Sequence, residues 1–599
     1  MLQELVKYAE EHGIETEPGF KPKPVRWAIC FDERGNFLDV VELGDVGAKN
    51  NSGQMFPKCP DLSQPELTSG KETRCHFLIE AAEVVALYSK GEPAPKTKEK
   101  HDYFIALLRQ AQAALPELAL LARKLTQSET MEAIQRRMAE KTQPKLKPTD
   151  RVTLKLGSVF PVESDGWHDW WRHFRSRLAS NATSAGKEGG GAAPGPFTMR
   201  CFVTGAIVSP TPTHPKIEGL ADVGGQPSGS SLVGFDKESF ASYGLDQSAN
   251  AAVSEEAAAA YRAGLNELIR NHSTRLVGAK VVHWFKGRVP QEDDPLAWLE
   301  EPQEAEELSA QKRARDLLNA IREGRRPDLA ENVYYALTLS GAGGRVMVRD
   351  WMEGRFETLI GNIADWFNDL SITHRDGGRL APPPKFLAVL GATVRALDDL
   401  ASPLVAKTWR VATRDEPIPY TMLAEALLRA RADFLQDQPP NHARMGLIKA
   451  YHLRKQTQNG GESMTADLQP FLNEQHPHSA YQFGRLMAVL AALQRRALGD
   501  VGAGIIQRYY AAASSTPALV LGRLVRTSQF HLNKLDPGLA HWFEDRIASI
   551  WARIKENPPR TLDLEEQSLF AMGYYQQLAQ RLGKQKNENE NENKEENRE

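Results

Sequence analysis

Hydrophobic and polar residues alternate near the start of the chain in a pattern typical of β-strands. Every second residue from Val25 to Phe31 is large and apolar, which is the period of a strand with one buried face. Residues 32–36 are turn formers, and 37–43 have the composition of a returning strand, so the pattern predicts a β-hairpin. Shorter alternating stretches follow at 152–156 and 199–203, and helical periods cover 73–89 and 100–125.

After Val253 the apolar positions change to a helical period. Ser254 is a favourable N-cap, and Glu255 and Glu256 suit the positive end of a helix dipole. A short strand is expected at 281–285, and helical periods dominate from about residue 331 onward. The predicted fold class is α+β, with an antiparallel sheet in a mixed N-terminal region, a mainly helical middle and a C-terminal helical bundle.

The C-terminal bundle is predicted because several apolar stripes of helical period follow one another, which is typical of four helices with short connections. The last residues repeat Asn and Glu and have nothing apolar to bury, so we expect them to be disordered. The predicted domains are a mixed α/β region at 1–250, a mainly helical region at 251–463, the four-helix bundle at 464–585 and the acidic tail at 586–599.

Composition changes this picture little. The 599 residues include 74 Lys and Arg against 77 Asp and Glu, so any contact with nucleic acid depends on local patches. The four cysteines have no CxxC spacing, which argues against a zinc ribbon, and we expect no metal and no cofactor. There is no signal-peptide pattern and no apolar run of about 18 residues, so a cytoplasmic protein without a membrane partner is expected.

Motifs for catalysis are absent from the sequence. It contains no phosphate-binding GxxxxGK[ST] loop, no GxGxxG, no HExxH and no GxSxG. His168 and Asp169 form a His-Asp pair of the kind that binds metal in phosphohydrolases, but such sites need further ligands. The simpler interpretation is a helix start whose aromatic neighbours, among them Trp167 and Trp171, pack inward. We therefore expect a protein that is not an enzyme, with a metal-dependent nuclease using this pair as the alternative.

A first polar loop with candidate binding residues follows the predicted hairpin. Amide side chains can pair with base edges, and lysine or arginine can neutralise phosphates, although a solvated surface loop has the same composition. The candidates are Lys49, Asn50, Asn51, Ser52, Gln54, Lys71 and Arg74.

A second candidate loop is rich in glycine, proline and serine between 211 and 231. Small residues allow the backbone to approach a ligand closely, and long loops of compact domains are often functional, although a plain long loop is equally compatible. The candidates there are His214, Lys216, Gln226 and Ser228.

The first half of the predicted bundle is locally basic. Between Arg485 and Lys534 the only acidic residue is Asp500, and such an excess suits a single-stranded nucleic acid as well as a solvated face. The candidates are Arg485, Arg495, Arg496, Arg523 and Arg526.

Several of these stretches together resemble one family, the large subunit of the type I-C CRISPR Cascade complex. The most specific is 232–254, in which Ser242-Tyr243-Gly244 precedes Gln247, Asn250 and the Ser254 cap. Residues 201–205, 214–216, 342–351 and 481–490 fit the same family, so the resemblance covers nearly the whole chain. The chain departs from the family at 77–82, and at 341–344 it carries glycines where asparagine is usual.

The resemblance implies a subunit that recognises a short protospacer-adjacent motif in duplex DNA, promotes strand opening and R-loop formation, and holds the displaced strand. Guide pairing reads the target, while a recruited helicase-nuclease cuts. The implied partners are the backbone, guide-processing and small subunits, the CRISPR RNA, the target duplex and the displaced single strand. A purely structural adaptor is a further alternative.

The resemblance also implies that the small subunit is similar to the C-terminal bundle and can arise by internal translation. Met464 is the preferred start, because it precedes the bundle and follows Gly460-Gly461-Glu462, whose codons can spell a ribosome-binding sequence. Met487 would cut into the first helical stripe.

Overall fold

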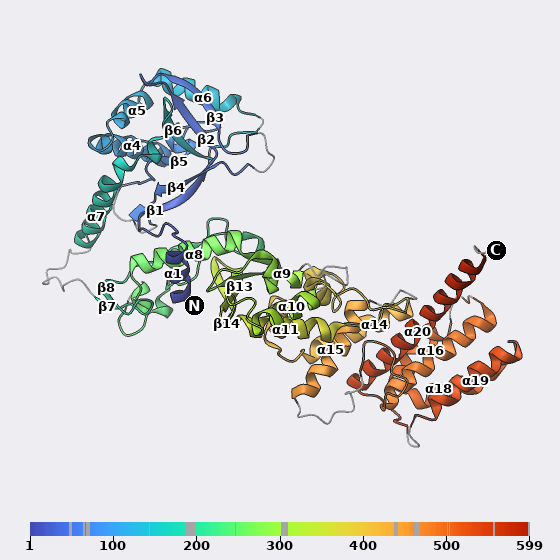
Figure 1. Cartoon of the computed structure of the whole chain (residues 1–599). Helices are drawn as coiled ribbons and strands as arrows, with labels where there is room; N and C mark the ends of the chain where they lie inside the picture. Colours follow the sequence, from blue (N-terminus) through green and yellow to red (C-terminus); the bar gives the residue numbers. More distant parts are fainter. Residues whose placement is uncertain are drawn as a thin grey trace. The chain divides into compact units, whose positions relative to one another are not determined.

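The fold is given by a computed structural model of the chain (Figure 1). It describes residues 1–599 except 47–50, 64–65, 68–71, 143, 186–197, 236, 246, 301–309, 437–440, 459–467, 500, 502–503, 555–557 and 597–599, and except the side chains of 179–185, 402, 456–458 and 583–596. Two compact units are present. Unit 1 comprises Met1–Ala221, Gly225–Asn271 and Ala342–Val346, and unit 2 comprises Asp222–Gly224, His272–Gly341 and Met347–Glu599.

The predicted hairpin near the N-terminus is part of a four-stranded sheet in unit 1. Strands β2 (Trp27–Phe31) and β3 (Phe37–Glu42) are antiparallel, and β6 (Arg151–Leu156) pairs parallel to β2. The sheet ends at β5 (Ile79–Ala81), in the order β3-β2-β6-β5. The Asp32 carboxylate closes the β2–β3 turn by accepting hydrogen bonds from the N–H groups of Arg34 and Asn36. These strands together with the helices described below confirm the α+β class.

The helix predicted over 73–89 is wrong. The segment contains β5 and only one short helix, α3 (Ala82–Val85). Leu78 has a positive φ of 59°, which a helix does not accommodate, and Ile79 pairs with Thr153 of β6 instead. The apolar residues of this segment are instead buried in a sheet. The local sequence does not reveal the strand with which the segment pairs.

Helices and aromatic residues complete the core around this sheet. Helices α4 (Pro95–Gln110), α5 (Glu117–Leu125) and α6 (Ser128–Glu140) contribute their apolar faces. At the start of α7 (His168–Ala185), Trp167 and Trp171 are fully buried, and the Trp171 and Phe77 rings stack with centroids 5.7 Å apart. The expectation that this aromatic segment packs inward is confirmed.

A second ribbon in unit 1 carries the first polar loop. Strands β1 (Phe20–Val25) and β4 (Gln54–Pro60) pair antiparallel. The chain enters β4 through Gly53, which has a φ of 92° and a Cα so close to the Val25 carbonyl that a Cβ would clash with it. Only glycine fits this position, so the end of the polar loop is fixed by the backbone.

The rest of unit 1 is built on two helices, α1 (Leu2–Glu11) and α8 (Glu255–Asn271), which pack together at Gly264. The predicted cap is confirmed, since the Ser254 hydroxyl accepts a hydrogen bond from the Ala257 N–H at 3.1 Å. Short strands surround these helices: β7 (Met199–Arg200), β8 (Ile207–Val208), β9 (Lys216–Ile217) and β10 (Ser230–Ser231). The unit continues past the predicted boundary at 250 to the end of α8.

Unit 2 has strands both before residue 331 and after it, where helices were expected. Strands β11 (Ser273–Leu276) and β12 (Ala279–Phe285) pair antiparallel, which includes the strand predicted at 281–285. Two long strands follow, β13 (Val333–Ala342) and β14 (Arg345–Arg355), and β12 pairs with β13. Residues 342–346 comprise the end of β13, the turn and the start of β14, and they belong to unit 1.

The middle of unit 2 is helical, as predicted. Its helices are α9 (Pro295–Glu300), α10 (Ala310–Arg322), α11 (Phe356–Leu370), α12 (Phe386–Gly391), α13 (Ser402–Arg414), α14 (Tyr420–Leu435) and α15 (His442–Gln458).

The C-terminal segment has five helices among its described residues, where four were expected. They are α16 (Ser479–Leu498), α17 (Ile505–Ser515), α18 (Pro517–Leu532), α19 (Pro537–Trp551) and α20 (Leu564–Glu596). One apolar core runs from Leu276 to Tyr575, so the predicted boundary at 464 lies within a single unit. The backbone of α20 is helical to Glu596, where composition predicts a disordered tail.

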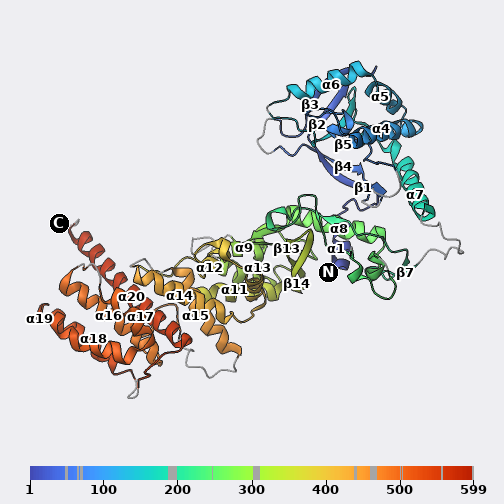
Figure 2. The same ribbon diagram turned by 180° about the vertical axis from the view of Figure 1, so that it is seen from behind.

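Helix α16 is central to this segment because it is buried along most of its length. It lies beside α20 in both views (Figures 1 and 2). The two helices meet through glycines: a Cβ on Gly484 would clash with the Phe570 carbonyl, and one on Gly573 with the Tyr481 carbonyl. None of the helices in the described part of the chain has the length and apolar composition needed to cross a bilayer.

The close approach of α16 and α20 predicts opposite effects for two glycine substitutions. Gly484→Ala should lower the free energy of unfolding of unit 2 by about 1–3 kcal/mol or more, because a methyl group has no space there. Gly522→Ala is the matched control, since a Cβ on Gly522 in α18 meets nothing within 4 Å. It should raise stability by up to about 1 kcal/mol through helix propensity. Urea unfolding followed by circular dichroism measures both, and equal effects of the two variants would contradict the interpretation.

Candidate nucleic-acid interface

The first polar loop is shaped by Asn51, whose side chain is buried. Its amide N–H groups donate to the Glu42 carboxylate at 2.9 Å and to the Leu43 carbonyl at 2.8 Å. Its amide oxygen accepts from the Gly53 N–H at 2.8 Å. Asn51 was expected to face a ligand, but these bonds use its polar groups within the chain, because a buried amide must be paired.

The neighbouring candidates differ from Asn51 in exposure. Ser52 is exposed and Gln54 is half-buried, with its amide 3.4 Å from the Glu163 carboxylate. Met55, beside them on β4, is also exposed. Lys49 and Asn50 lie outside the described residues. Ser52 and Gln54 are therefore the described side chains of this loop that remain accessible to a ligand.

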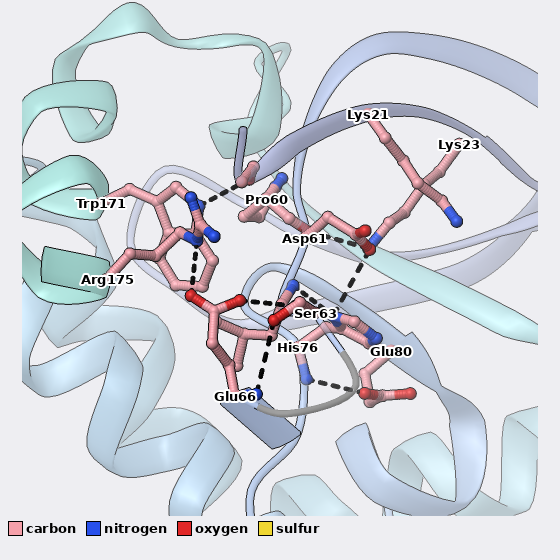
Figure 3. A network of polar contacts seen from close by, with 12 residues as sticks. Lys21, Lys23, Pro60, Asp61, Ser63, Glu66, His76, Glu80, Trp171 and Arg175 are labelled. Carbon is pink, nitrogen blue, oxygen red and sulfur yellow. Dashed lines mark hydrogen bonds and ion pairs between the residues drawn. The ribbon is translucent and has the colours of Figure 1, made fainter. Parts of the chain in front are cut away.

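A buried ion pair joins strand β1 to the segment that follows β4 (Figure 3). The Lys23 ammonium is 3% exposed, donates to the Pro60 carbonyl at 2.7 Å and lies 3.0 Å from the Asp61 carboxylate. Burial lowers the pKa of Lys23. Burial alone would raise the pKa of Asp61, but the neighbouring cations, Lys23 first, outweigh it and hold that pKa below its ordinary value.

His76 belongs to the same network and is neutral in it. Its Nδ1 accepts a hydrogen bond from the Leu62 N–H at 3.3 Å, while its own backbone N–H donates to Glu80 at 2.8 Å. Burial, with the nearby Lys23 charge, lowers the pKa of His76 to about 4. An imidazole that accepts at Nδ1 carries no proton there, which is consistent with the lowered pKa.

Glu66 connects the segment after β4 to helices α7 and α8, and Arg74 is bonded to its backbone. Arg74 donates to the Glu66 carbonyl at 2.7 Å, so part of its donor capacity is used inside the fold. The Arg175 guanidinium of α7 bridges Glu66 at 2.8 Å and Glu255 of α8 at 2.7 Å. Lys71 lies outside the described residues, between the two anchored ends.

The second candidate loop divides into a buried and an exposed part. His214 is buried: its Nδ1 lies 2.7 Å from the Tyr261 hydroxyl, and burial lowers its pKa to about 4. It was expected to face nucleic acid, but its ring is part of the packing around α8. Lys216, Gln226 and Ser228 are exposed.

The three exposed candidates are brought together by the pairing of β9 with β10. Ile217 pairs with Ser230, which folds the intervening residues back on themselves, and Gly229 lies against the Cβ of Lys216. The Gln226 N–H donates to the Ser230 hydroxyl at 3.0 Å, and the Gly229 N–H donates to the Gln226 carbonyl at 2.9 Å. These bonds leave the Gln226 and Ser228 side chains on the surface of the turn.

Two residues that the sequence pattern did not single out lie next to this turn. Arg345 pairs with Ser231 of β10, and its guanidinium lies 4.7 Å from the centre of the Phe240 ring. Gly344 lies close to the Gln226 side chain. Arg345 and Phe240 belong to segments that carry the family resemblance, but they are far apart in the sequence, so only the fold brings them together.

In the C-terminal segment, α18 presents a stripe of two basic side chains flanked by two apolar ones. Leu519, Arg523, Arg526 and Phe530 are spaced by four, three and four residues and therefore share one face. Leu519 is 77% exposed and Phe530 is 72% exposed, and both arginines are exposed. Neither guanidinium forms an ion pair with another residue that the structure describes. The two apolar residues were not predicted, although the helical spacing could have identified them.

The other arginines of this segment differ from these two. Arg495 and Arg496 are exposed near the end of α16. Arg485 was expected on the basic surface, but it is 1% exposed, and it donates to the Gln577 side chain at 3.1 Å and to the Glu474 carbonyl at 2.9 Å. Its position on the buried α16 explains the difference.

The His168-Asp169 pair does not converge on one point. His168 is buried, with its Nδ1 3.4 Å from Asp165, whereas the Asp169 carboxylate is exposed and lies 2.6 Å from Arg172. Among the residues that the structure describes, no group of three or more His, Cys, Asp and Glu is placed to hold a metal ion.

Comparison with known proteins gives one result. A family model described as CRISPR-associated protein (Cas_Csd1) matches residues 3–582. No curated protein matches the chain.

The neutral His76 predicts a loss of stability in mild acid. Its pKa is about 4 in the fold and about 6.5 in the unfolded chain, so the unfolded state binds more protons between these values. Stability is complete above about pH 6.5 and falls by up to about 3 kcal/mol as the pH drops towards 4. His76→Asn keeps an acceptor in place of Nδ1 and should make this decline shallower by the His76 contribution, while the part due to His214 remains. Urea unfolding with tryptophan fluorescence measures the change.

His541→Asn is the control for this measurement, because the His541 side chain is 74% exposed. It should keep the pH profile of the unmodified protein. A His76→Asn profile identical to that of the unmodified protein would contradict the assignment.

Proposed function

Because the chain belongs to the Cas_Csd1 family of CRISPR-associated proteins, which confirms the resemblance noted in its sequence, we propose that this Cascade subunit reads a flanking motif in duplex DNA. It then promotes strand opening and R-loop formation and holds the displaced strand. The observation that carries the proposal is the match over 3–582, which covers nearly every described element. Two accessible regions of unit 1 and one stripe of unit 2 provide the surfaces for this function.

The proposed reading surface comprises Ser52 and Gln54 with the turn at Lys216, Gln226 and Ser228. Amide side chains recognise base edges through paired donors and acceptors, and a lysine nearby can neutralise a phosphate. Precise reading requires side chains on a fixed backbone. The Asn51 hydrogen bonds fix the loop, and the Lys23–Asp61 ion pair fixes the strands that carry it. Both interactions help to meet this requirement.

The proposed track for the displaced strand is the α18 stripe. Arginines attract the phosphates of a single strand, and exposed apolar rings offer surfaces on which bases stack. Arg523, Arg526 and Phe530 combine both properties on one helix face, and Leu519 adds exposed apolar surface beside them. Arg495 and Arg496 would extend the basic surface on α16.

The proposed complex contains a CRISPR RNA, backbone and guide-processing subunits, a small subunit and a recruited helicase-nuclease that supplies the cut. In this proposal the chain is not an enzyme. The alternative is a metal-dependent nuclease at His168 and Asp169. Cleavage of DNA by the purified chain with added divalent metal, abolished by Asp169→Ala, would favour that alternative over ours.

The small subunit is proposed to be translated from the same message, starting at Met464. Met464 lies outside the described residues, after α15 and before α16. A product that starts there contains all of α16 to α20. It lacks α14 and α15, whose Phe434 and His452 contact Tyr574 and Ser568 of α20 in the full chain.

Two substitutions in the first polar loop should distinguish recognition of the flank from stability of the loop. Gln54→Ala should reduce the preference of the assembled complex for its correct flank by about 5- to 100-fold, the value of one amide–base pairing. Asn51→Ala should instead weaken binding to all flanks alike, because it releases the loop. Competition binding with duplexes of randomised flank measures both. Gln110→Ala, an exposed glutamine of α4, is the control, and unchanged flank preference in Gln54→Ala would refute its role.

Substitutions in α18 should weaken single-strand binding in a salt-dependent way. Arg523→Ala combined with Arg526→Ala should lower the affinity of the full chain for oligothymidine and reduce the slope of log K against log salt by about 0.7 for each phosphate that is no longer neutralised. A matched double variant, Arg325→Ala with Arg553→Ala, removes two exposed arginines that already have partners in the chain. If both double variants change the slope equally, the stripe is not the track.

A further inference from the structure

Tyr243 stands at the tip of a tight turn and is almost completely exposed. The Leu245 N–H donates to the Ser242 carbonyl at 2.9 Å, and the two residues between them, Tyr243 and Gly244, have φ values of 52° and 69°. The Tyr243 side chain is 99% exposed, the highest value among the large hydrophobic residues that the structure describes. The phenol ring therefore makes almost no contact within the chain.

This combination is unfavourable for folding alone. Two central residues with positive φ are typical of a type I′ turn, which prefers Asn-Gly, and a bulky residue in the first position is strained. An exposed aromatic ring also gains nothing from burial. Backbone strain of this kind persists where the surrounding structure enforces it, and it concentrates at functional sites.

Asn250 enforces the turn. Its side-chain oxygen accepts from both the N–H and the hydroxyl of Ser242, each at 3.0 Å. Its side-chain N–H groups donate to the carbonyls of Leu245 and Gln247, both at 2.9 Å. The Asn250 side chain thus forms hydrogen bonds with both ends of the turn and with Gln247, which follows it.

The segment that carries Asn250 is itself anchored. Ser248 is buried and its N–H donates to the Pro212 carbonyl at 3.3 Å. The carbonyls of Ala252 and Val253 accept from the N–H groups of Phe202 and Thr211. Hydrogen bonds to the 202–212 segment therefore hold the residues that carry Asn250. The position of Tyr243 is fixed without a ligand.

The surroundings favour a nucleic-acid ligand. Phe240, three residues before Tyr243, carries the Arg345 guanidinium over its ring, and Arg345 pairs with β10 at the end of the turn that presents Gln226 and Ser228. The tyrosine thus belongs to the same part of unit 1 as the proposed reading surface. A flat ring held rigidly in solvent offers a stacking surface at low entropic cost to any base, whatever its sequence.

We propose that Tyr243 is a stacking platform for an unpaired nucleobase where the duplex opens, and that Asn250 is its positioning residue. The proposal rests on the DNA-reading function proposed above. The ring contributes van der Waals contact with the base, and the hydroxyl is not required. Phosphate contacts are made elsewhere and do not depend on Tyr243.

The test uses the full chain and two forked DNA duplexes that differ in one arm, which is oligothymidine in the first and an abasic backbone of equal length in the second. The unmodified protein should bind the first fork on the order of tenfold more tightly. Tyr243→Phe should keep this preference. Tyr243→Asn should lose it, although asparagine suits the turn better than tyrosine and should not destabilise the fold.

Asn250→Ala should also lose the preference, because it frees the turn while the ring is retained. Binding to the abasic fork should be unchanged in all three variants.

The outcomes separate the two proposals. If the unmodified protein binds neither fork, the DNA-binding function itself fails. If it binds both forks equally, or if Tyr243→Asn keeps the preference, stacking by Tyr243 is refuted while DNA binding stands. If Tyr243→Asn keeps the preference but no longer assembles with its partner subunits, Tyr243 is a protein contact and the proposal is overturned.

Discussion

The ion pair between Lys23 and Asp61 is the interaction on which the functional part of unit 1 depends. An ammonium group that is 3% exposed is tolerated only when it is paired and hydrogen-bonded, because water no longer stabilises its charge. Lys23 meets this condition with Asp61 and the Pro60 carbonyl, which fixes β1 against the end of β4. His76, whose Nδ1 lies 3.7 Å from Asp61, belongs to the same network, and Arg175 joins Glu66 to α7 and α8. The polar loop, which lies between β3 and β4, thus enters a strand whose far end is fixed by this network.

Because buried polar groups must be hydrogen-bonded, the polar residues discussed above fall into two groups. Asn51, His214 and Arg485 are buried, and their bonds to Glu42, Tyr261 and Gln577 shape the backbone. Gln54, Gln226, Arg523 and Arg526 stay accessible on backbone that such bonds hold in place. Recognition and folding are thus carried by neighbouring residues of similar chemistry, and a substitution in one group tests a different property from a substitution in the other.

Tyr243 combines both roles in one turn. Its ring is free for a ligand because Asn250, two carbonyl groups and the buried Ser248 maintain a backbone conformation that tyrosine does not favour. In unit 2 a different constraint operates, since Gly484 and Gly573 allow α16 and α20 to approach until side chains larger than hydrogen would clash. The bundle that presents the α18 stripe is built around this close approach.

The sequence by itself determined those features that depend on neighbouring residues. The 25–43 hairpin follows from alternation and from the Asp32 turn, the Ser254 cap from a hydroxyl before a helical period, and the inward packing of Trp167 and Trp171 from their spacing. Only the tertiary structure decided which polar residues are buried. The partners Glu42, Tyr261 and Gln577 lie 9, 47 and 92 residues from Asn51, His214 and Arg485, and local composition does not identify them. The same reason explains β5 and β13, whose pairing with the distant strands β6 and β12 overrides the helical periods of their own segments.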